Sequence, residues 1–236
     1  MYIMIVAGNW KMNLNINEAI ELSNGLLKHN EFFVEEKIII FPSFLIIPEI
    51  YNLYKNSKVS IGAQDCSMYD NGAFTGQVSA KMIKDAGCKY VIIGHSERRS
   101  LCHETSSIVS LKAVKAISAG LKVIICIGEN LKDRENGDYL FVLEDQLKKS
   151  LSGISSDCNL ICNAIIIAYE PVWAIGTGNN ASKKNIEEVH KFIKEIIKTN
   201  YQFNYDLPIL YGGSVNSKNS SEIFKINNVD GVLVGG

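Results

Sequence analysis

A single carboxylate, Glu170, stands between an apolar run and a loop bordered by proline and glycine. Residues 163–167 are mostly apolar and indicate a buried strand, and Pro171 prevents a helix from starting at Glu170. Pro171 stiffens the near side of the loop, while Gly176 and Gly178 free its far side. The pattern predicts a general base at the end of a strand and beneath a lid, which suits chemistry that must exclude water.

Hydrogen-bond donors follow two other strand-like runs. Asn9 and Lys11 come after the first run of the chain, and His95 comes after the fourth. Proton abstraction beside a carbonyl needs a base at the carbon and donors at the oxygen, where enediolate charge develops. A glutamate with an ordinary pKa of about 4.3 is a weak base for a carbon acid, so the donors must lower most of the barrier. We therefore expect Glu170 to act together with these three donors.

Glycine-rich turns follow the last two strand-like runs. The first is Gly212-Gly213-Ser214, and the second is Gly235-Gly236. Turns of this kind expose backbone N–H groups that can cradle a phosphate, as the N-terminus of a helix also does. The sequence therefore indicates a phosphate site close to the expected base.

Eight short runs rich in β-branched residues alternate with longer segments of helical period. The expected strands are 3–7, 37–41, 59–63, 90–93, 122–127, 164–168, 208–211 and 231–234. The clearest expected helices are 17–28, 106–119, 139–151 and 186–199. Strands that are apolar throughout are typical of parallel sheets covered by helices.

Both an open doubly wound sheet and a closed (β/α)8 barrel fit this order of elements. The count of eight strands favours the barrel, as does Gly8-Asn9-Trp10 in place of a Gly-x-Gly-x-x-Gly turn after the first run. No linker or composition break divides the chain, so residues 1–236 are expected to form one barrel domain. Functional residues of a barrel follow the C-terminal ends of its strands, which is where Glu170 and His95 stand.

The composition excludes several classes of protein. With 236 residues and 47% hydrophobic content, the chain can bury a large core and is not expected to be disordered. The net charge of -1 and the lack of a dense Lys/Arg block argue against nucleic-acid binding. The apolar start is too short for a signal peptide or a membrane span. Six cysteines without a CxxC pair indicate neither a disulfide framework nor a metal site, and hence a reducing cytoplasm.

Four motifs, in order along the chain, resemble those of the triosephosphate isomerase family. They are Ala7-Gly8-Asn9-Trp10-Lys11-Met12-Asn13, Gly94-His95-Ser96-Glu97-Arg98-Arg99, the Glu170 loop and Tyr211-Gly212-Gly213-Ser214. The resemblance extends from the first strand to the last. It implies a TIM barrel that interconverts dihydroxyacetone phosphate and D-glyceraldehyde 3-phosphate without a metal or an organic cofactor.

The resemblance also implies a role for each site residue. Glu170 would be the base, His95 a neutral electrophile, and Asn9 and Lys11 donors that also bind the substrate. The residues expected around the substrate phosphate are Gly176, Ser214, Gly235 and Gly236. In the closed lid, Tyr211 and Ser214 are expected to meet Ala181 and Gly178.

A short helix is expected to begin beside His95, with Ser96 as its candidate N-cap. The positive end of that helix would disfavour the imidazolium and keep the ring neutral. Cys126 and Glu97 are expected to support the site, with Cys126 acting as a small buried hydrophobe.

The segment from Gln64 to Gln77 is long for a βα loop and carries apolar residues. In the resembling family this loop inserts into a second subunit, so a homodimer is expected. The family continues into a final helix after its last strand, whereas this chain stops at Gly236. That helix is missing from the given chain, and its contribution to the phosphate site is expected to be missing as well.

Two other functions remain open on the residues alone. A barrel aldolase could use Lys11 as an imine-forming nucleophile, and a barrel without catalysis could serve for binding. The other histidines stand apart from any chemical motif and are expected at the surface; they are His29, His103 and His190.

Overall fold

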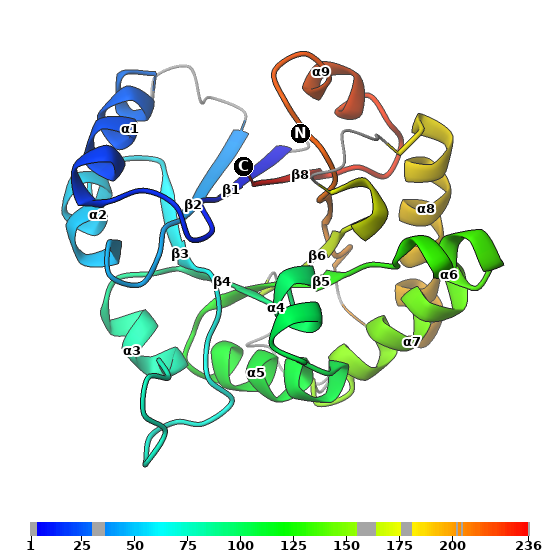
Figure 1. Ribbon diagram of the computed structural model, residues 1–236, viewed down its shortest axis with the longest axis horizontal. Coiled ribbons are helices and arrows are strands. Elements are labelled where there is room, and N and C mark those ends of the chain that lie inside the picture. The colour runs from blue at the N-terminus through cyan, green and yellow to red at the C-terminus, as the bar shows by residue number, and fades with distance from the viewer. Residues whose placement is uncertain are drawn as a thin grey trace.

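In the computed structural model, eight parallel strands close into a barrel in the order β1 to β8 (Figure 1). The structure describes residues 4–29, 36–154, 164–175, 181–201, 203 and 205–235. The strands are β1 Met4–Asn9, β2 Glu36–Phe41, β3 Ser60–Ala63, β4 Tyr90–Ile93, β5 Lys122–Ile127, β6 Ile165–Tyr169, β7 Ile209–Tyr211 and β8 Gly231–Gly235. The predicted (β/α)8 barrel is thus confirmed, and each expected strand is found.

Each strand is apolar throughout because its two faces meet two different cores. Ile124 and Ile166 are paired in register and belong to the cluster inside the barrel. Their successors Ile125 and Ile167 belong to the cluster between the barrel and the helices. Alternate residues of a strand point to opposite faces, so a strand buried on both faces reads as a continuous apolar run.

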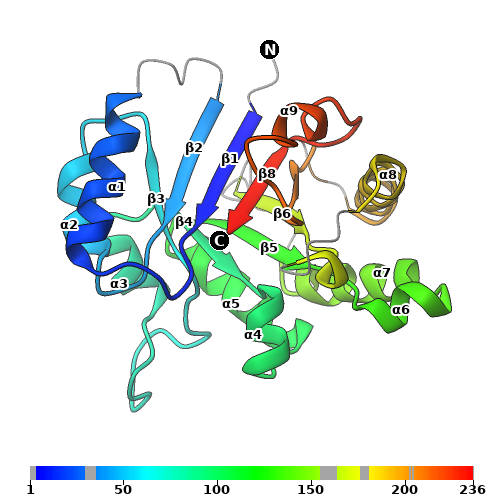
Figure 2. The same cartoon turned by 45° about the horizontal axis from the view of Figure 1, so that its top comes forward.

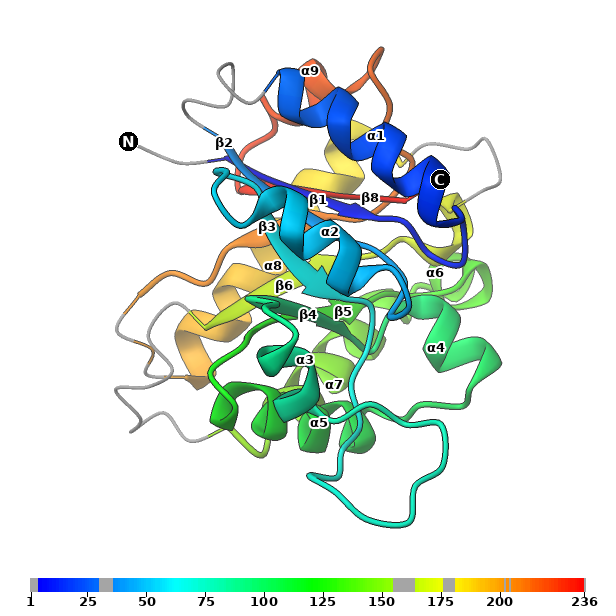
Figure 3. The same cartoon turned by 90° about the vertical axis from the view of Figure 1, so that its left-hand side faces the viewer.

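The helices surround the barrel, as the views along and across it show (Figures 1 and 3). They are α1 Ile16–Lys28, α2 Ile47–Tyr54, α3 Ala80–Asp85, α4 Ser96–Leu101, α5 Ser106–Ser118, α6 Leu131–Asn136, α7 Tyr139–Leu151, α8 Lys183–Asn200 and α9 Ser220–Ile223. The four helices expected from periodicity correspond to α1, α5, α7 and α8. The shorter helices span too few turns for a period to be read from the sequence.

Local signals explain where the long helices begin. Asn15 and Glu18 form a capping box at the start of α1, and Thr105 caps α5. Ser182 caps α8 through the backbone N–H of Asn185. Within the described ranges, none of the helices combines the length and the hydropathy that crossing a bilayer requires.

The parallel strands bring the expected functional residues to one end of the barrel. Figure 2 shows the arrowheads of β1, β2 and β8 pointing toward this end, where α4 also lies. The segment after β3 leaves the barrel as a long excursion before α3 (Figures 1 and 2). The expected functional side chains of the described residues therefore lie near one another, at the C-terminal ends of the strands.

Candidate active site

Glu170 lies directly after β6 with its side chain only 2% exposed. Its N–H donates to the carbonyl of Ile127 at 2.8 Å, which continues the pairing of β5 with β6 by one residue. Glycines flank it on both sides: a Cβ at Gly128 would lie 1.9 Å from the Glu170 carbonyl oxygen, and one at Gly212 would lie 3.0 Å from its Cγ. The strand end is therefore packed so tightly that only glycine fits beside the carboxylate-bearing residue.

Both carboxylate oxygens of Glu170 have a partner. Oε1 lies 2.9 Å from Nε2 of His95, and Oε2 accepts the Ser96 N–H at 2.9 Å. A carboxylate held in this way is fixed in direction, and it must give up at least one of these partners to reach a substrate carbon.

His95, rather than Ser96, is the N-cap of α4. The His95 Nδ1 accepts the backbone N–H of Glu97 at 3.3 Å, and Ser96 is the first residue of the helix. The expected Ser96 cap is wrong because the imidazole nitrogen itself satisfies the free N–H of the first turn. This hydrogen bonding assigns the proton to Nε2, which donates to Glu170, and it suits a neutral ring.

The charges around His95 act against the expected lowering of its pKa. Burial lowers the pKa of this imidazole, but the hydrogen bond and charge of Glu170 and the charge of Glu97 raise it by more, so its net direction is upward. Glu97 Oε2 lies 3.5 Å from Nδ1. The expected lowering of the His95 pKa is therefore wrong, because the two carboxylates favour the charged ring by more than burial disfavours it.

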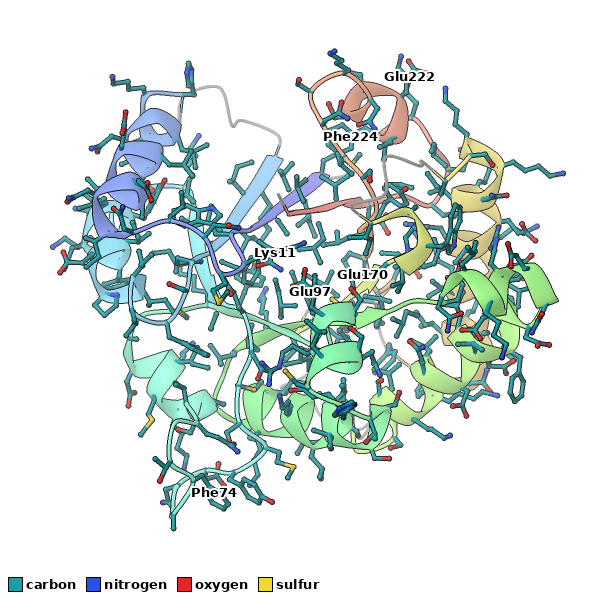
Figure 4. All side chains as sticks on the ribbon, in the orientation of Figure 1. Lys11, Phe74, Glu97, Glu170, Glu222 and Phe224 are labelled. Carbon is teal, nitrogen blue, oxygen red and sulfur yellow. The ribbon has the colours of Figure 1, made fainter. Side chains whose placement is uncertain are left out.

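Lys11 enters the site from a strained backbone. Its φ of 52° lies in the left-handed region, and the conformation is fixed by Asn9 Oδ1, which accepts the Lys11 N–H at 2.9 Å, and by Gln64 Nε2, which donates to its carbonyl at 2.7 Å. Its Nζ lies 2.9 Å from Glu97 Oε1. In Figure 4 the side chains of Lys11, Glu97 and Glu170 converge over the end of the barrel.

One pocket brings together most of the residues expected from the sequence. Its lining includes Asn9, Lys11, His95, Glu170, Ser214 and Gly235. Gly176 and Gly236, the other residues expected near the phosphate, lie outside the described residues. Ile175 and Leu233 also line the pocket. Their place there cannot be predicted from the sequence, because an apolar residue in an apolar run carries no chemical signal.

The segment after Glu170 is tied to the turn after β7. Ser214 Oγ donates to the carbonyl of Ala174 at 2.7 Å, and Tyr211 is hydrogen-bonded to the backbone of Ala181. The Tyr211 contact is the one expected from the sequence. The other expected partner, Gly178, lies outside the described residues.

Glu129 anchors the start of this segment, a role that the sequence analysis did not assign. Its fully buried carboxylate accepts the Trp173 indole N–H at 2.8 Å and the Tyr169 hydroxyl at 3.0 Å. Arg134 Nη1 lies 3.6 Å from the same oxygen. Burial raises the pKa of the Glu129 carboxyl by more than these hydrogen bonds lower it. The short η2 turn, Val172–Ala174, is thereby held to the end of β5.

The prediction of a surface position is wrong for one of the three remaining histidines. His190 of α8 is fully buried, its Nδ1 lies 2.9 Å from the Asn228 carbonyl, and its ring packs edge-on against Tyr169 at 5.9 Å. Burial lowers the pKa of His190 to about 4. His29 and His103 are exposed, as expected.

Cys126 is fully buried, in keeping with its expected role as a small hydrophobe. Among the described residues, no group of three or more His, Cys, Asp or Glu side chains is arranged to hold a metal ion. The polar side chains that line the pocket include a carboxylate, an imidazole, an ammonium and an amide.

Comparison with known proteins identifies the family of the chain. The family model described as triosephosphate isomerase matches residues 4–236. A triosephosphate isomerase of Lawsonia intracellularis is 44% identical over 99% of this chain and 92% of the relative. One of Prosthecochloris aestuarii is 43% identical over 98% of this chain and 91% of the relative. Because the family model matches almost the whole chain and these relatives are more than 40% identical over nearly all of it, the chain belongs to the triosephosphate isomerase family.

Proposed function

We propose that this protein is an aldose-ketose isomerase of glycolysis and gluconeogenesis that interconverts dihydroxyacetone phosphate and D-glyceraldehyde 3-phosphate. The observation that carries the proposal is the 2.9 Å contact between Glu170 Oε1 and His95 Nε2, inside a pocket that also holds Lys11 and Asn9. A base and three donors then surround a space where a carbon acid and its carbonyl oxygen can lie. We place this activity on a single domain spanning residues 1–236.

Glu170 would move one proton between adjacent carbons. It leaves His95 and Ser96, takes the proton from the hydroxyl-bearing carbon, and the electron pair passes to the carbonyl oxygen to give an enediolate. The protonated Glu170 then returns the proton to the neighbouring carbon. As the new carbonyl forms, the hydroxyl proton of the first carbon passes through His95 Nε2 to the former carbonyl oxygen. The geometry supports this role because the carboxylate is buried, lines the pocket and is held in direction by His95 Nε2 and the Ser96 N–H.

His95 would donate its Nε2 proton to the substrate oxygens as charge develops. Once Glu170 has moved to the carbon, the carboxylate that raises the pKa of His95 most strongly is gone, and the Glu97 N–H at Nδ1 favours the neutral ring. Lys11 supplies the fixed positive charge, and Asn9 both orients Lys11 and contributes an amide. Charge stabilisation of this kind is the largest part of such catalysis.

Ser214 and Gly235 would bind the substrate phosphate together with Gly176 and Gly236. Ser214 faces the pocket and is linked through its hydroxyl to Ala174, so a phosphate bound there would draw the lid segment with it. Closure has a chemical purpose, because an enediolate beside a carbon–phosphate oxygen bond can expel phosphate when water reaches it.

The protein is further proposed to act as a homodimer through the loop from Gln64 to Gln77. Phe74 lies at the outer tip of this loop (Figure 4), where its ring stacks on Tyr69 at 3.8 Å. A cavity of about 340 Å³ lies between the base of the loop and α4, with Phe44 and Cys102 in its lining. A partner's loop tip would enter this cavity, and the neighbouring Leu45, 88% exposed, would be covered.

A cytoplasmic location is proposed as well, since the cysteines of the described ranges are free thiols and three of them are buried. The proposed reaction uses no cofactor and no metal. Neither nucleic acid nor membrane has a part in it.

The test is a coupled assay of glyceraldehyde 3-phosphate isomerisation on the wild-type chain and on Glu170→Gln. Turnover by the wild type that is lost in the variant supports the proposal. Absence of turnover in both rejects it, and ligand binding without turnover would favour a non-catalytic barrel. Borohydride trapping with a ketose phosphate examines the aldolase alternative. The Lys11 to Glu97 ion pair argues against that alternative, because an imine-forming lysine must be neutral.

A further inference from the structure

A single side chain of α7 satisfies both backbone hydrogen-bonding groups of the residue that follows β5. The Gly128 N–H donates to Gln146 Oε1 at 2.9 Å, and Gln146 Nε2 donates to the Gly128 carbonyl at 2.9 Å. The paired register of β5 ends at Ile127, so Gly128 has no strand partner there. A planar amide bonded at both ends fixes the position and the tilt of this backbone.

The clamped glycine lies directly against the proposed base. A Cβ on Gly128 would stand 1.9 Å from the carbonyl oxygen of Glu170, and the N–H of Glu170 is bonded to the residue before the glycine. No gap separates the two backbones. A displacement of Gly128 must therefore displace the peptide from which the Glu170 side chain extends.

The residue after the clamp is Glu129, which anchors the lid segment. Besides the Trp173 and Tyr169 contacts of its carboxylate, its carbonyl accepts the Val172 N–H at 3.0 Å. The backbone held by Gln146 thus supports the base on one side and the start of the lid on the other.

We propose that Gln146 is a positioning residue whose amide clamp on Gly128 sets both the carboxylate of Glu170 and the N-terminal hinge of the lid. The inference rests on the proposed isomerase function. Gln146 lies outside the lining of the pocket and acts only through the Gly128–Glu129 backbone. Its loss should therefore reduce turnover more than substrate affinity.

The first test is Gln146→Met, which keeps the length of the side chain and removes both hydrogen bonds. We expect kcat to fall by about 10- to 100-fold, since a displacement on the order of 1 Å at a catalytic group costs this much. KM changes less, because the phosphate contacts are untouched. The NMR resonance of the Trp173 indole N–H, assigned with Trp173→Phe, shifts because its acceptor on Glu129 moves.

The control is Leu147→Ala, on the next residue of α7, which is fully buried in the outer core. This variant loses packing without touching Gly128, so it lowers Tm but leaves the Trp173 resonance and kcat near their wild-type values. An unchanged resonance with unchanged kcat in Gln146→Met overturns the proposal. Equal changes in the two variants overturn it as well.

A second variant keeps the proposal testable if Gln146→Met does not fold. Gln146→Glu retains an acceptor for the Gly128 N–H and loses the donor to its carbonyl, so we expect a shift of the Trp173 resonance in the same direction and a partial loss of kcat. An unmoved resonance in this variant would reject the clamp. The Trp173 resonance is measured without substrate, so it tests the hydrogen bonds between Gln146 and Gly128 independently of turnover. A wild type without turnover would reject the isomerase function, and the resonance would still decide whether Gln146 positions this backbone.

Discussion

The length of the Glu170 side chain decides where its carboxylate can reach. Both of its oxygens sit 2.9 Å from donors on one side of the pocket. Glu170→Asp keeps the charge and retracts it by one methylene. We expect kcat to fall by at least about 100-fold, because misplacing a reacting group on the order of 1 Å has this effect.

Binding of a phosphate-bearing inhibitor should hardly change in Glu170→Asp, since Ser214 and Gly235 are untouched. Steady-state kinetics and inhibition measurements separate the two quantities. Glu188→Asp, on the exposed face of α8, is the matched control and should leave both at wild-type values. Equal losses of binding and turnover would argue that Glu170 is not the base.

The pKa of His95 is raised in the free protein, where burial is outweighed by Glu170 and Glu97. Glu170→Gln removes the stronger of the two carboxylates, so we expect the pKa of His95 to fall in that variant. NMR titration of the imidazole resonances measures it. His190, whose pKa burial lowers to about 4, titrates in a different range and is easily told apart. An unchanged His95 titration would show that Glu170 does not act on the ring.

The same contact makes part of the stability dependent on pH. A pKa raised in the folded state stabilises fully below the unfolded value of about 6.5 and loses that contribution as pH rises through the folded pKa. The difference in unfolding free energy between wild type and Glu170→Gln should therefore be largest below about pH 6.5 and shrink as the pH rises above it. Urea unfolding at a pH on either side of this value measures it.

At the scale of elements, the link between the end of β5 and the η2 turn depends on one buried carboxylate. Trp173→Phe removes the 2.8 Å indole hydrogen bond to Glu129. A hydrogen bond to a buried charged group contributes about 1.5–3 kcal/mol, so the unfolding free energy should fall by that amount. Chemical denaturation is the measurement.

Tyr139→Phe is the control for the hinge, because it removes a 2.8 Å hydrogen bond to the carboxylate of Glu188 at the surface. A change at a surface position stays within about 0.5 kcal/mol. Equal losses of unfolding free energy in the two variants would show that the buried hydrogen bond to Glu129 stabilises the fold no more than the surface hydrogen bond to Glu188.

The strands could be predicted from sequence because burial on two faces leaves a continuous apolar run, as in Ile165–Tyr169. The side chains that line the pocket could be predicted because a polar residue at the end of such a run has few other uses. Glu129 and Gln146 could not be found in the same way. Their roles arise from contacts with Trp173 and Gly128, which lie far from them in sequence and meet only in the closed barrel.

Local geometry set a second limit on prediction. Ser96 matched the preference for a serine cap, but the ring of His95 took that position once the chain turned after β4. His190 stands apart from any chemical motif, but its position four residues after Ile186 and three before Ile193 places it on the apolar face of α8. Tertiary contacts override such local preferences, and they are strongest where the site is built.

At the scale of the whole molecule, closure of the barrel brings the first and last strands of the chain side by side. Asn9 and Gly235 stand at opposite ends of the described chain and are paired in register between β1 and β8. A Cβ on Gly235 would lie 2.8 Å from Cε of Lys11, so the last strand also shapes the space around the ammonium. The position of the Lys11 ammonium therefore depends on closure of the barrel and not on any one βα unit.

The loop from Gln64 to Gln77 is the segment that we propose contacts a second copy of the protein. Phe74→Asp puts a charge at the loop tip, and burying that charge in a partner's cavity would cost several kcal/mol. We expect the wild type to sediment as a dimer and the variant as a monomer, measured by analytical ultracentrifugation. Phe141→Asp, at a 72% exposed phenylalanine of α7, is the matched control and should remain dimeric. A monomeric wild type, or a dimeric Phe74→Asp, would contradict the loop as the interface.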